Sequence, residues 1–326
     1  MKKEIKISGI TMHSGVVSSM LIRTTKSGGI VFVRNGKNVF AEYKNVFVLG
    51  LRNTTIGKSP DQVQTIEHLM AALFICGIKN AKIEIDNVEP PILEGGADEF
   101  VKKLSSLTGK EERRFLIVKK EIIASQSEIK LPWFIRFNNF IRGRKQSDRF
   151  VKLSPTGKNA LEISARLIYP DKIIGDQNTE FIFDYDNSEK SKKEFMKDFA
   201  NSRTFGTVSE WEWAKKHGMG RGANEHNVIG IGTIDDLEKL QELGIGKSVK
   251  KKDVFLIPGT KMAALTGLHH RNEFVRHKII DVLGDLYTSG FSIIGKCESH
   301  KGSHALNNLV IKKLFSNPAN YKIVKI

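Results

Sequence analysis

The sequence predicts an α+β fold made of two similar α/β domains, each with helices that cover a sheet. Three observations support this prediction. The chain has 326 residues, which is enough for two domains with a hydrophobic core each. Both halves of the sequence end in the same order of helix, strand, loop and helix. The first helix of each closing pattern carries a histidine, as expected of a duplicated α/β unit.

The first half of the chain opens with strands and continues into a helix. Short apolar runs between polar and glycine-containing loops predict strands at 5–8, 19–25, 30–33 and 39–49. Thr65 is expected to open a helix that Gly77 ends, because apolar residues recur at helical spacing between them. The half closes with a strand, a Pro/Gly loop and a helix, at 81–86, 89–96 and 97–107.

The second half begins after the charged stretch 109–114, so we expect domains at 1–112 and 113–326. Further strands are predicted at 115–123, 150–153, 160–169 and 179–184, followed by a helix at 189–201. The closing pattern is a helix, a strand, a glycine-containing loop and a helix, at 273–288, 291–297, 299–303 and 304–314.

Charge and cysteine usage narrow the class of protein. The formal net charge is +16, which favours anionic partners such as phosphorylated substrates, acidic membrane surfaces or nucleic acid. A general lysine bias explains the charge at least as well, because the lysines are scattered along the chain. Cys76 and Cys297 lie in apolar segments without a C-x-x-C pattern, which predicts reduced thiols. With no secretory signal and no bilayer-length apolar run, we expect a cytoplasmic protein.

The predicted helix at 273–288 brings chemistry-bearing residues together. His277, Asp281 and Asp285 follow one another by one turn on one face, and apolar residues occupy the other. An imidazole and a carboxylate at this spacing can share a metal ion. A solvated helix face is nevertheless the better explanation of an isolated H-x-x-x-D pattern, so the metal interpretation requires a third ligand and a base.

Glu67 and His68, in the first turn of the first-half helix, could supply both. A catalytic zinc site usually has three protein ligands and one position open for water, so His68 would complete the set. Bound zinc lowers the pKa of water from ~15.7 towards ~7, and Glu67 would accept the proton. The alternative is a solvated helix start, where the helix dipole favours an acidic residue.

Two further residues suit acid and oxyanion roles. His304 opens the last helix, where capping or a surface contact is the simpler role. With Asp285 as its carboxylate partner, a protonated His304 could donate to a leaving amine. The segment 202–206 is expected at a helix end, and its Thr204 hydroxyl could hydrogen-bond an oxyanion.

Four motifs in this order resemble those of LpxC, the zinc-dependent UDP-3-O-acyl-N-acetylglucosamine deacetylase family of lipid A synthesis. They are TIEHLMAAL at 65–73, SRTFG at 202–206, RHKIIDVLGDL at 276–286 and HALNN at 304–308. The glycine-flanked loop 9–15 is also similar to the family's N-terminal loop. The match covers nearly the whole chain, and four separated motifs in register are highly specific.

The resemblance implies a fold and a set of catalytic roles. The two domains would pack their helical layers against each other between two outer sheets, as a β-α-α-β sandwich. Zn²⁺ would bind the three residues His68, His277 and Asp281. Glu67 would be the general base and Thr204 would hydrogen-bond the oxyanion. His304, held by Asp285, would act as the general acid or as a cationic stabiliser of the tetrahedral intermediate.

The resemblance also implies how the substrate is bound. Lys278 and Lys301 would contact the diphosphate of UDP, and Phe205 would line the sugar site. An insert at about 207–232 would form a tunnel for the acyl chain, and Tyr169 is the nearest candidate for the uracil face. The sequence departs from the family pattern at 93–96 and 223–226, so the acyl-chain length is not predicted.

Two other functions stay open at this point. A binding protein could use the basic, aromatic stretch 130–147 on nucleic acid or an anionic membrane, but this leaves the ligand set without a purpose. We therefore expect no nucleic-acid partner, and membrane contact only as an accessory to a monomeric enzyme. A related metal hydrolase could act on a different nucleotide sugar.

Overall fold

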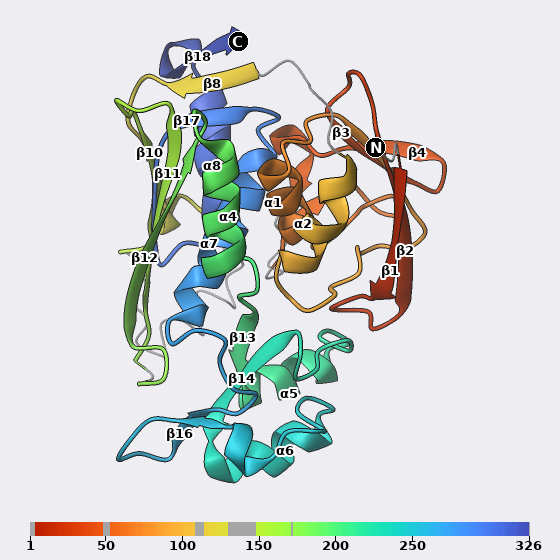
Figure 1. The fold of residues 1–326 in the computed structure, drawn as a ribbon, viewed down its shortest axis with the longest axis vertical. Helices are drawn as coiled ribbons and strands as arrows, with labels where there is room; N and C mark the ends of the chain where they lie inside the picture. The colour runs from red at the N-terminus through yellow and green to blue at the C-terminus, as the bar shows by residue number, and fades with distance from the viewer. Residues whose placement is uncertain (1–3, 48–52, 108–113, 130–147, 171, 326) are drawn as a thin grey trace.

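The computed structural model describes residues 4–47, 53–107, 114–129, 148–170 and 172–325 (Figure 1). The expected domain boundary at 112–113 and the basic segment 130–147 lie outside these residues, so the domain limits remain predictions. Within the described part of the chain, no helix combines the length and the apolarity that crossing a bilayer requires.

The first sheet comes from the first 85 residues and has the order β1-β2-β7-β3-β4. Its strands are β1 (Glu4–Ile10), β2 (Val17–Thr24), β3 (Ile30–Arg34), β4 (Lys37–Phe40) and β7 (Ala81–Ile85). The pair β3–β7 is parallel and the other pairs are antiparallel. The run predicted as one strand at 39–49 is divided: a 3-10 helix (Tyr43–Asn45) follows β4, and β5 (Val46–Phe47) pairs with β6 (Thr55–Ile56).

The second sheet has seven strands, and its central strand β17 is flanked by β10, β11 and β8. Its strands are β8 (Arg114–Val118), β9 (Ile122–Ser125), β10 (Phe150–Ser154), β11 (Ala160–Ile168), β12 (Asp176–Asp184), β17 (Ser292–His300) and β18 (Tyr321–Lys325). The single strand predicted at 115–123 is two strands, β8 and β9. The sequence analysis did not predict β18, which pairs with β8.

Two helical layers lie between these sheets, which confirms the expected β-α-α-β sandwich (Figure 1). Beside the first sheet are α1 (Glu67–Ile75) and α2 (Asp98–Leu104). Beside the second are α4 (Ser188–Asp198), α7 (Glu273–Tyr287) and α8 (His304–Phe315). Helices α1 and α7 pack against each other, so one hydrophobic core runs through both halves. This packing brings the helices that carry His68 and His277 into contact.

Helix α1 is buried along its whole length, because it lies between the first sheet and α7 (Figure 1). Glu67 and His68 are only 3% and 5% exposed, which excludes a solvated helix start. The helix begins at Glu67 rather than at the predicted Thr65, which adopts a left-handed conformation with a φ of 56°. Such a backbone is rare for a β-branched residue, so the neighbouring structure holds the entry to this helix firmly.

The two helices approach most closely at Gly284 of α7. A Cβ atom at this position would lie 1.9 Å from the carbonyl oxygen of Glu67, well inside van der Waals contact. Any larger residue would push α7 away from the start of α1. The glycine therefore sets the distance between the predicted base, Glu67, and the helix that carries His277 and Asp281.

A smaller unit is inserted before α7, and it has its own sheet and its own small core. Its elements are β13 (Thr204–Thr207), α5 (Val208–Lys216), β14 (Val228–Thr233), α6 (Leu237–Glu242), β15 (Phe255–Leu256) and β16 (Met262–Ala264). The parallel pair β13–β14 with α5 forms a βαβ unit, and the sheet continues through residue 264, past the predicted limit of 232. The prediction that 202–206 ends a helix is wrong, because α4 ends at Asp198 and Thr204 begins β13.

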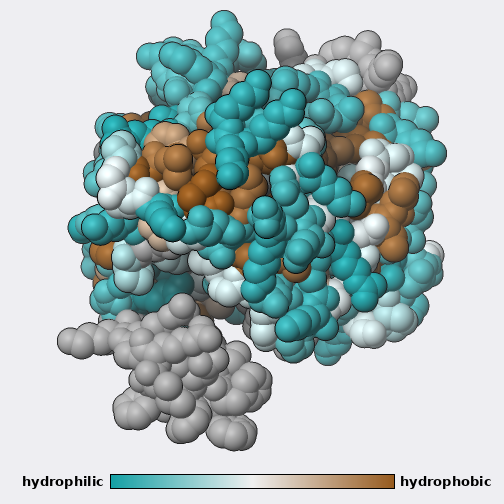
Figure 2. Space-filling model, turned by 90° about the horizontal axis from the view of Figure 1, so that it is seen from below, coloured by the Kyte–Doolittle hydropathy of each residue, from teal (hydrophilic) through white to brown (hydrophobic). Residues whose placement is uncertain are grey.

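This inserted unit carries exposed apolar side chains. Trp213, Leu256 and Phe255 are 55%, 44% and 38% exposed. Figure 2 views the molecule from the side of this unit and shows apolar residues gathered among hydrophilic ones. Apolar surface of this kind commonly marks a binding region.

Candidate active site

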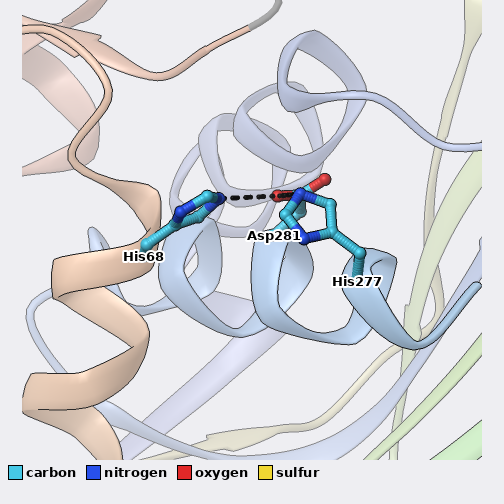
Figure 3. Close-up of side chains that lie close together, drawn as sticks. All are labelled: His68, His277 and Asp281. Atoms are coloured by element: carbon cyan, nitrogen blue, oxygen red, sulfur yellow. Dashed lines mark ion pairs between the residues drawn. The ribbon is translucent and has the colours of Figure 1, made fainter. Parts of the chain in front are cut away.

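Three predicted metal ligands converge where α1 meets α7. His68 comes from α1, and His277 and Asp281 come from α7, one turn apart (Figure 3). The Oδ1 atom of Asp281 lies 3.4 Å from Nε2 of His277 and 3.7 Å from Nε2 of His68. One ligand atom from each residue lies within 4.8 Å of the other two, and all three residues are buried. This arrangement is the His–His–Asp cluster expected from the sequence.

The donor set and its spacing fit a zinc ion. Two ligands at ~2.0–2.1 Å from one tetrahedral ion are about 3.3–3.4 Å apart, which is close to both measured separations. His277 donates its Nδ1–H to the carbonyl oxygen of Ser202 at 2.9 Å, so its Nε2 lone pair faces the cluster. Lys278 donates to Oδ2 of Asp281 at 2.7 Å, which leaves Oδ1 toward the histidines.

The protonation states of this cluster also suit a cation. Burial lowers the pKa of His277 to about 4, so its imidazole is neutral near pH 7. Burial alone would raise the pKa of Asp281, but the Lys278 ammonium and the neighbouring histidines outweigh it and hold that pKa well below its usual range. A neutral imidazole and an ionised carboxylate are the forms that bind metal.

Glu67 and His304 lie beside the cluster and face each other. His304 Nε2 is 4.0 Å from Oε1 of Glu67 and also 4.0 Å from Oδ2 of Asp281. Burial raises the pKa of Glu67, which suits a carboxylate that has to accept a proton. Burial lowers the pKa of His304, but Asp285, Asp281 and Glu67 together outweigh this effect and raise it to about 10. His304 is therefore a cation near pH 7.

Asp285, the expected carboxylate partner of His304, lies in hydrogen-bond contact with it. Nδ1 of His304 donates to Oδ2 of Asp285 at 2.7 Å, which directs Nε2 toward Glu67 and the cluster. Asn307 donates to the same oxygen at 2.8 Å. Thr54 donates its hydroxyl to the other oxygen, Oδ1. Asp285, which the sequence placed on a solvated or metal-binding face, is therefore buried and saturated with donors.

The predicted substrate residues divide into two groups. The Phe205 ring packs edge-on to Tyr169 at 5.9 Å, and Nζ of Lys278 lies 6.0 Å from the Phe205 centroid. These three residues form one aromatic and cationic group next to the metal ligands. Lys301 belongs to another place, the turn between β17 and α8, where it pairs with Asp148 and has a φ of 50°.

Thr204 is held through its neighbour Arg203. The Arg203 guanidinium forms a buried ion pair with Glu273 of α7 at 2.9 Å, and it also donates to the carbonyl oxygen of Glu225 in the inserted unit. The adjacent Ser202 carbonyl accepts from His277. The start of β13 is thus fastened to the same helix that carries two metal ligands.

Sequence reasoning missed Thr54 and the Ser202 carbonyl. Thr54 lies in an irregular segment just before β6, and nothing in its spacing connects it to the motifs at 67, 285 or 304. Ser202 was noted only as part of its motif. Its contact with His277 uses the backbone carbonyl, which every residue type has, so the sequence does not indicate it. A pairing between segments 231 positions apart is visible only in the fold.

Comparison with known proteins gives one consistent result. A family model described as "LpxC: UDP-3-O-acyl N-acetylglycosamine deacetylase" matches residues 1–235 and 231–316. Proteins named UDP-3-O-acyl-N-acetylglucosamine deacetylase from Campylobacter lari and Wolinella succinogenes are each 31% identical, over 99% of this chain and 93% and 92% of their own lengths. One from a Nitratiruptor species is 30% identical over 99% of this chain and 92% of its own length.

Proposed function

Because this chain belongs to the LpxC family of UDP-3-O-acyl N-acetylglycosamine deacetylases, we propose that its buried His68, His277 and Asp281 hold a catalytic zinc ion. The protein is a hydrolase of lipid A biosynthesis. It removes the N-acetyl group from UDP-3-O-acyl-N-acetylglucosamine and yields acetate and UDP-3-O-acyl-glucosamine. The observation that carries the site assignment is the convergence of three buried ligand atoms from two distant helices, next to Glu67 and His304.

The proposed chemistry begins with a base. When bound, zinc would lower the pKa of a water molecule towards about 7 and polarise the acetyl carbonyl. Glu67 accepts the proton of the attacking water, and burial supports this role because it raises the pKa of the carboxyl group. The backbone N–H of Thr54 donates to Oε2 of Glu67 at 2.9 Å, so Oε1 is the oxygen free to take the proton.

Other residues carry out the second proton transfer and stabilise the oxyanion. His304, cationic near pH 7, gives its Nε2 proton to the amine nitrogen as the C–N bond breaks. Asp285 keeps Nδ1 protonated throughout, so the imidazole stays in one orientation. The Thr204 hydroxyl, at the start of β13, donates to the oxygen of the acetyl carbonyl as negative charge develops there.

The substrate contacts extend outward from this centre. We propose that Lys278 and Lys301 bind the diphosphate and that Phe205 lines the sugar site, with Tyr169 nearby for the uracil. The inserted unit would receive the acyl chain, which its exposed apolar side chains support. Lys278 already pairs with Asp281, so it would serve the metal ligand and the substrate together.

Metal removal tests the proposed function. Protein treated with a chelator is expected to stop releasing acetate from UDP-3-O-acyl-N-acetylglucosamine. Stoichiometric Zn²⁺ should restore the activity, because the metal held by the three ligands would activate the attacking water. The measurement is acetate release together with the zinc content per chain. Comparing substrates with acyl chains of increasing length would measure the longest chain that the proposed tunnel accepts. Full activity in metal-free protein would contradict the zinc assignment.

We also propose that the enzyme acts as a monomer in the cytoplasm and that the basic segment 130–147 touches the inner-membrane surface near its amphipathic substrate. Co-sedimentation with anionic vesicles, with and without residues 130–147 and at low and high salt, tests the contact. The intact chain should pellet more at low salt, because salt weakens the attraction between basic side chains and anionic lipid. Equal pelleting of both proteins would contradict it.

A further inference from the structure

Thr54 joins the two halves of the molecule at the active site. It comes from the first half, just before β6, and it is 2% exposed. The segment around it is fastened to the start of α1: Asn53 donates to the Thr65 hydroxyl at 2.8 Å, and the Thr54 carbonyl accepts from Ile66 at 3.3 Å. The position of Thr54 is therefore fixed by the same residues that fix the entry to the helix of Glu67.

The hydroxyl of Thr54 reaches the second half. It donates to Oδ1 of Asp285, and it lies 3.3 Å from Nδ1 of His304. The other carboxylate oxygen, Oδ2, accepts from His304 and Asn307. With donors on both oxygens, the Asp285 carboxylate cannot turn about its bond to Cβ without losing a hydrogen bond. The plane of the carboxylate in turn fixes the plane of the His304 ring.

The backbone of Thr54 reaches the base. Its N–H donates to Oε2 of Glu67 at 2.9 Å, inside the buried site. Glu67 Oε1 is then the oxygen that faces His304 Nε2, at 4.0 Å. One residue therefore contacts the proposed base directly and the proposed acid through its carboxylate partner.

We propose that Thr54 is a positioning residue that fixes the proposed base, Glu67, and the proposed acid, His304, relative to each other. This inference rests on the proposed function, because it takes the roles of those two residues from there. The hydroxyl acts through Asp285 and does not touch the metal ligands. Its loss leaves the backbone contact to Glu67 in place but frees one oxygen of Asp285. The acid then samples orientations that do not face the substrate, which lowers kcat more than it changes KM.

The isosteric variant Thr54→Val tests this proposal. We expect about a 10- to 100-fold loss of kcat with KM changed by less than about 2-fold, because this is the usual effect of losing a residue that orients a catalytic group. Thr54→Ser should recover most of the loss, since it restores the hydroxyl. Thr55→Val is the matched control, because the neighbouring Thr55 is also buried and its hydroxyl forms no hydrogen bond within the part of the chain that the structure describes. Zinc content and melting temperature are measured for each variant.

A second background separates positioning from a general structural role. In a His304→Ala enzyme, Thr54→Val should lower the residual kcat by less than about 2-fold, because there is no acid left to orient. An equal loss in both backgrounds, or a loss in Thr55→Val as large as in Thr54→Val, would overturn the proposal. So would near-normal kcat in Thr54→Val while His304→Ala is strongly impaired. Normal activity in His304→Ala itself would instead count against the proposed function, so the two failures are distinguishable.

Discussion

Glu67→Gln and His304→Ala are each expected to lower kcat for deacetylation by about 10²- to 10⁴-fold while the protein keeps its zinc. Glutamine has nearly the shape of glutamate but cannot take a proton from water. Alanine at 304 removes the cation whose Nε2 lies 4.0 Å from Glu67 and from Asp281. Neither side chain is one of the three proposed ligands, so metal binding should survive both changes. Steady-state kinetics and zinc content per chain check this result.

A variant with a partly exposed side chain provides the control for these two changes. Glu99→Gln alters an acidic residue in the first turn of another helix, α2, whose side chain is 47% exposed and pairs only with Lys103 among the ion pairs of the described residues. It should leave kcat, zinc content and melting temperature unchanged. Near-normal turnover in both Glu67→Gln and His304→Ala would remove the assignment of base and acid. A loss of zinc in either variant would mean that its residue contributes to the metal site.

The proposed metal ligands could be selected from the sequence because their positions follow local rules. His277 and Asp281 are one turn apart on any helix, and His68 begins a segment with strong apolar periodicity. The strands of both sheets were largely found in the same way, from short apolar runs. The family resemblance then supplied what periodicity lacks, namely that α1 and α7 face each other.

The errors of the sequence analysis arise where tertiary contacts override local pattern. Taken alone, the polar face of α7 is best explained by solvent, yet Asp281 and Asp285 are buried. Asp281 accepts from Lys278 of the same helix, and Asp285 accepts from Thr54, His304 and Asn307 of other elements. Thr204 was expected at a helix end, but it begins a strand that pairs with β14 in a mixed sheet, and the other strands of that sheet come later in the chain. The proposed role of Thr54 depends on its hydrogen bond to Asp285, which lies 231 positions away in the sequence. No window of neighbouring residues contains that information.

His68→Ala is expected to abolish deacetylation and to weaken zinc binding by more than the roughly 10- to 100-fold typical of losing an outer-shell partner. The reason is that the three proposed ligands come from two different helices. His277 and Asp281 belong to one helix, whereas His68 is the only ligand of the cluster that comes from the first half. Without it, two donors remain for an ion that requires three from the protein in a catalytic site. Calorimetric titration with Zn²⁺ and acetate release measure the two losses.

The same variant should uncouple the metal from folding stability. A zinc ion bound as proposed would join α1 to α7 in the parent protein, so added Zn²⁺ should stabilise the folded state and raise the melting temperature. In His68→Ala this increase should be much smaller, because the ion no longer connects the two helices. His226→Ala is the matched control, since His226 belongs to the inserted unit and lies outside the metal-ligand cluster found among the described residues. A His68→Ala protein with parental zinc affinity and turnover would refute the site, because no other histidine in that cluster comes from α1.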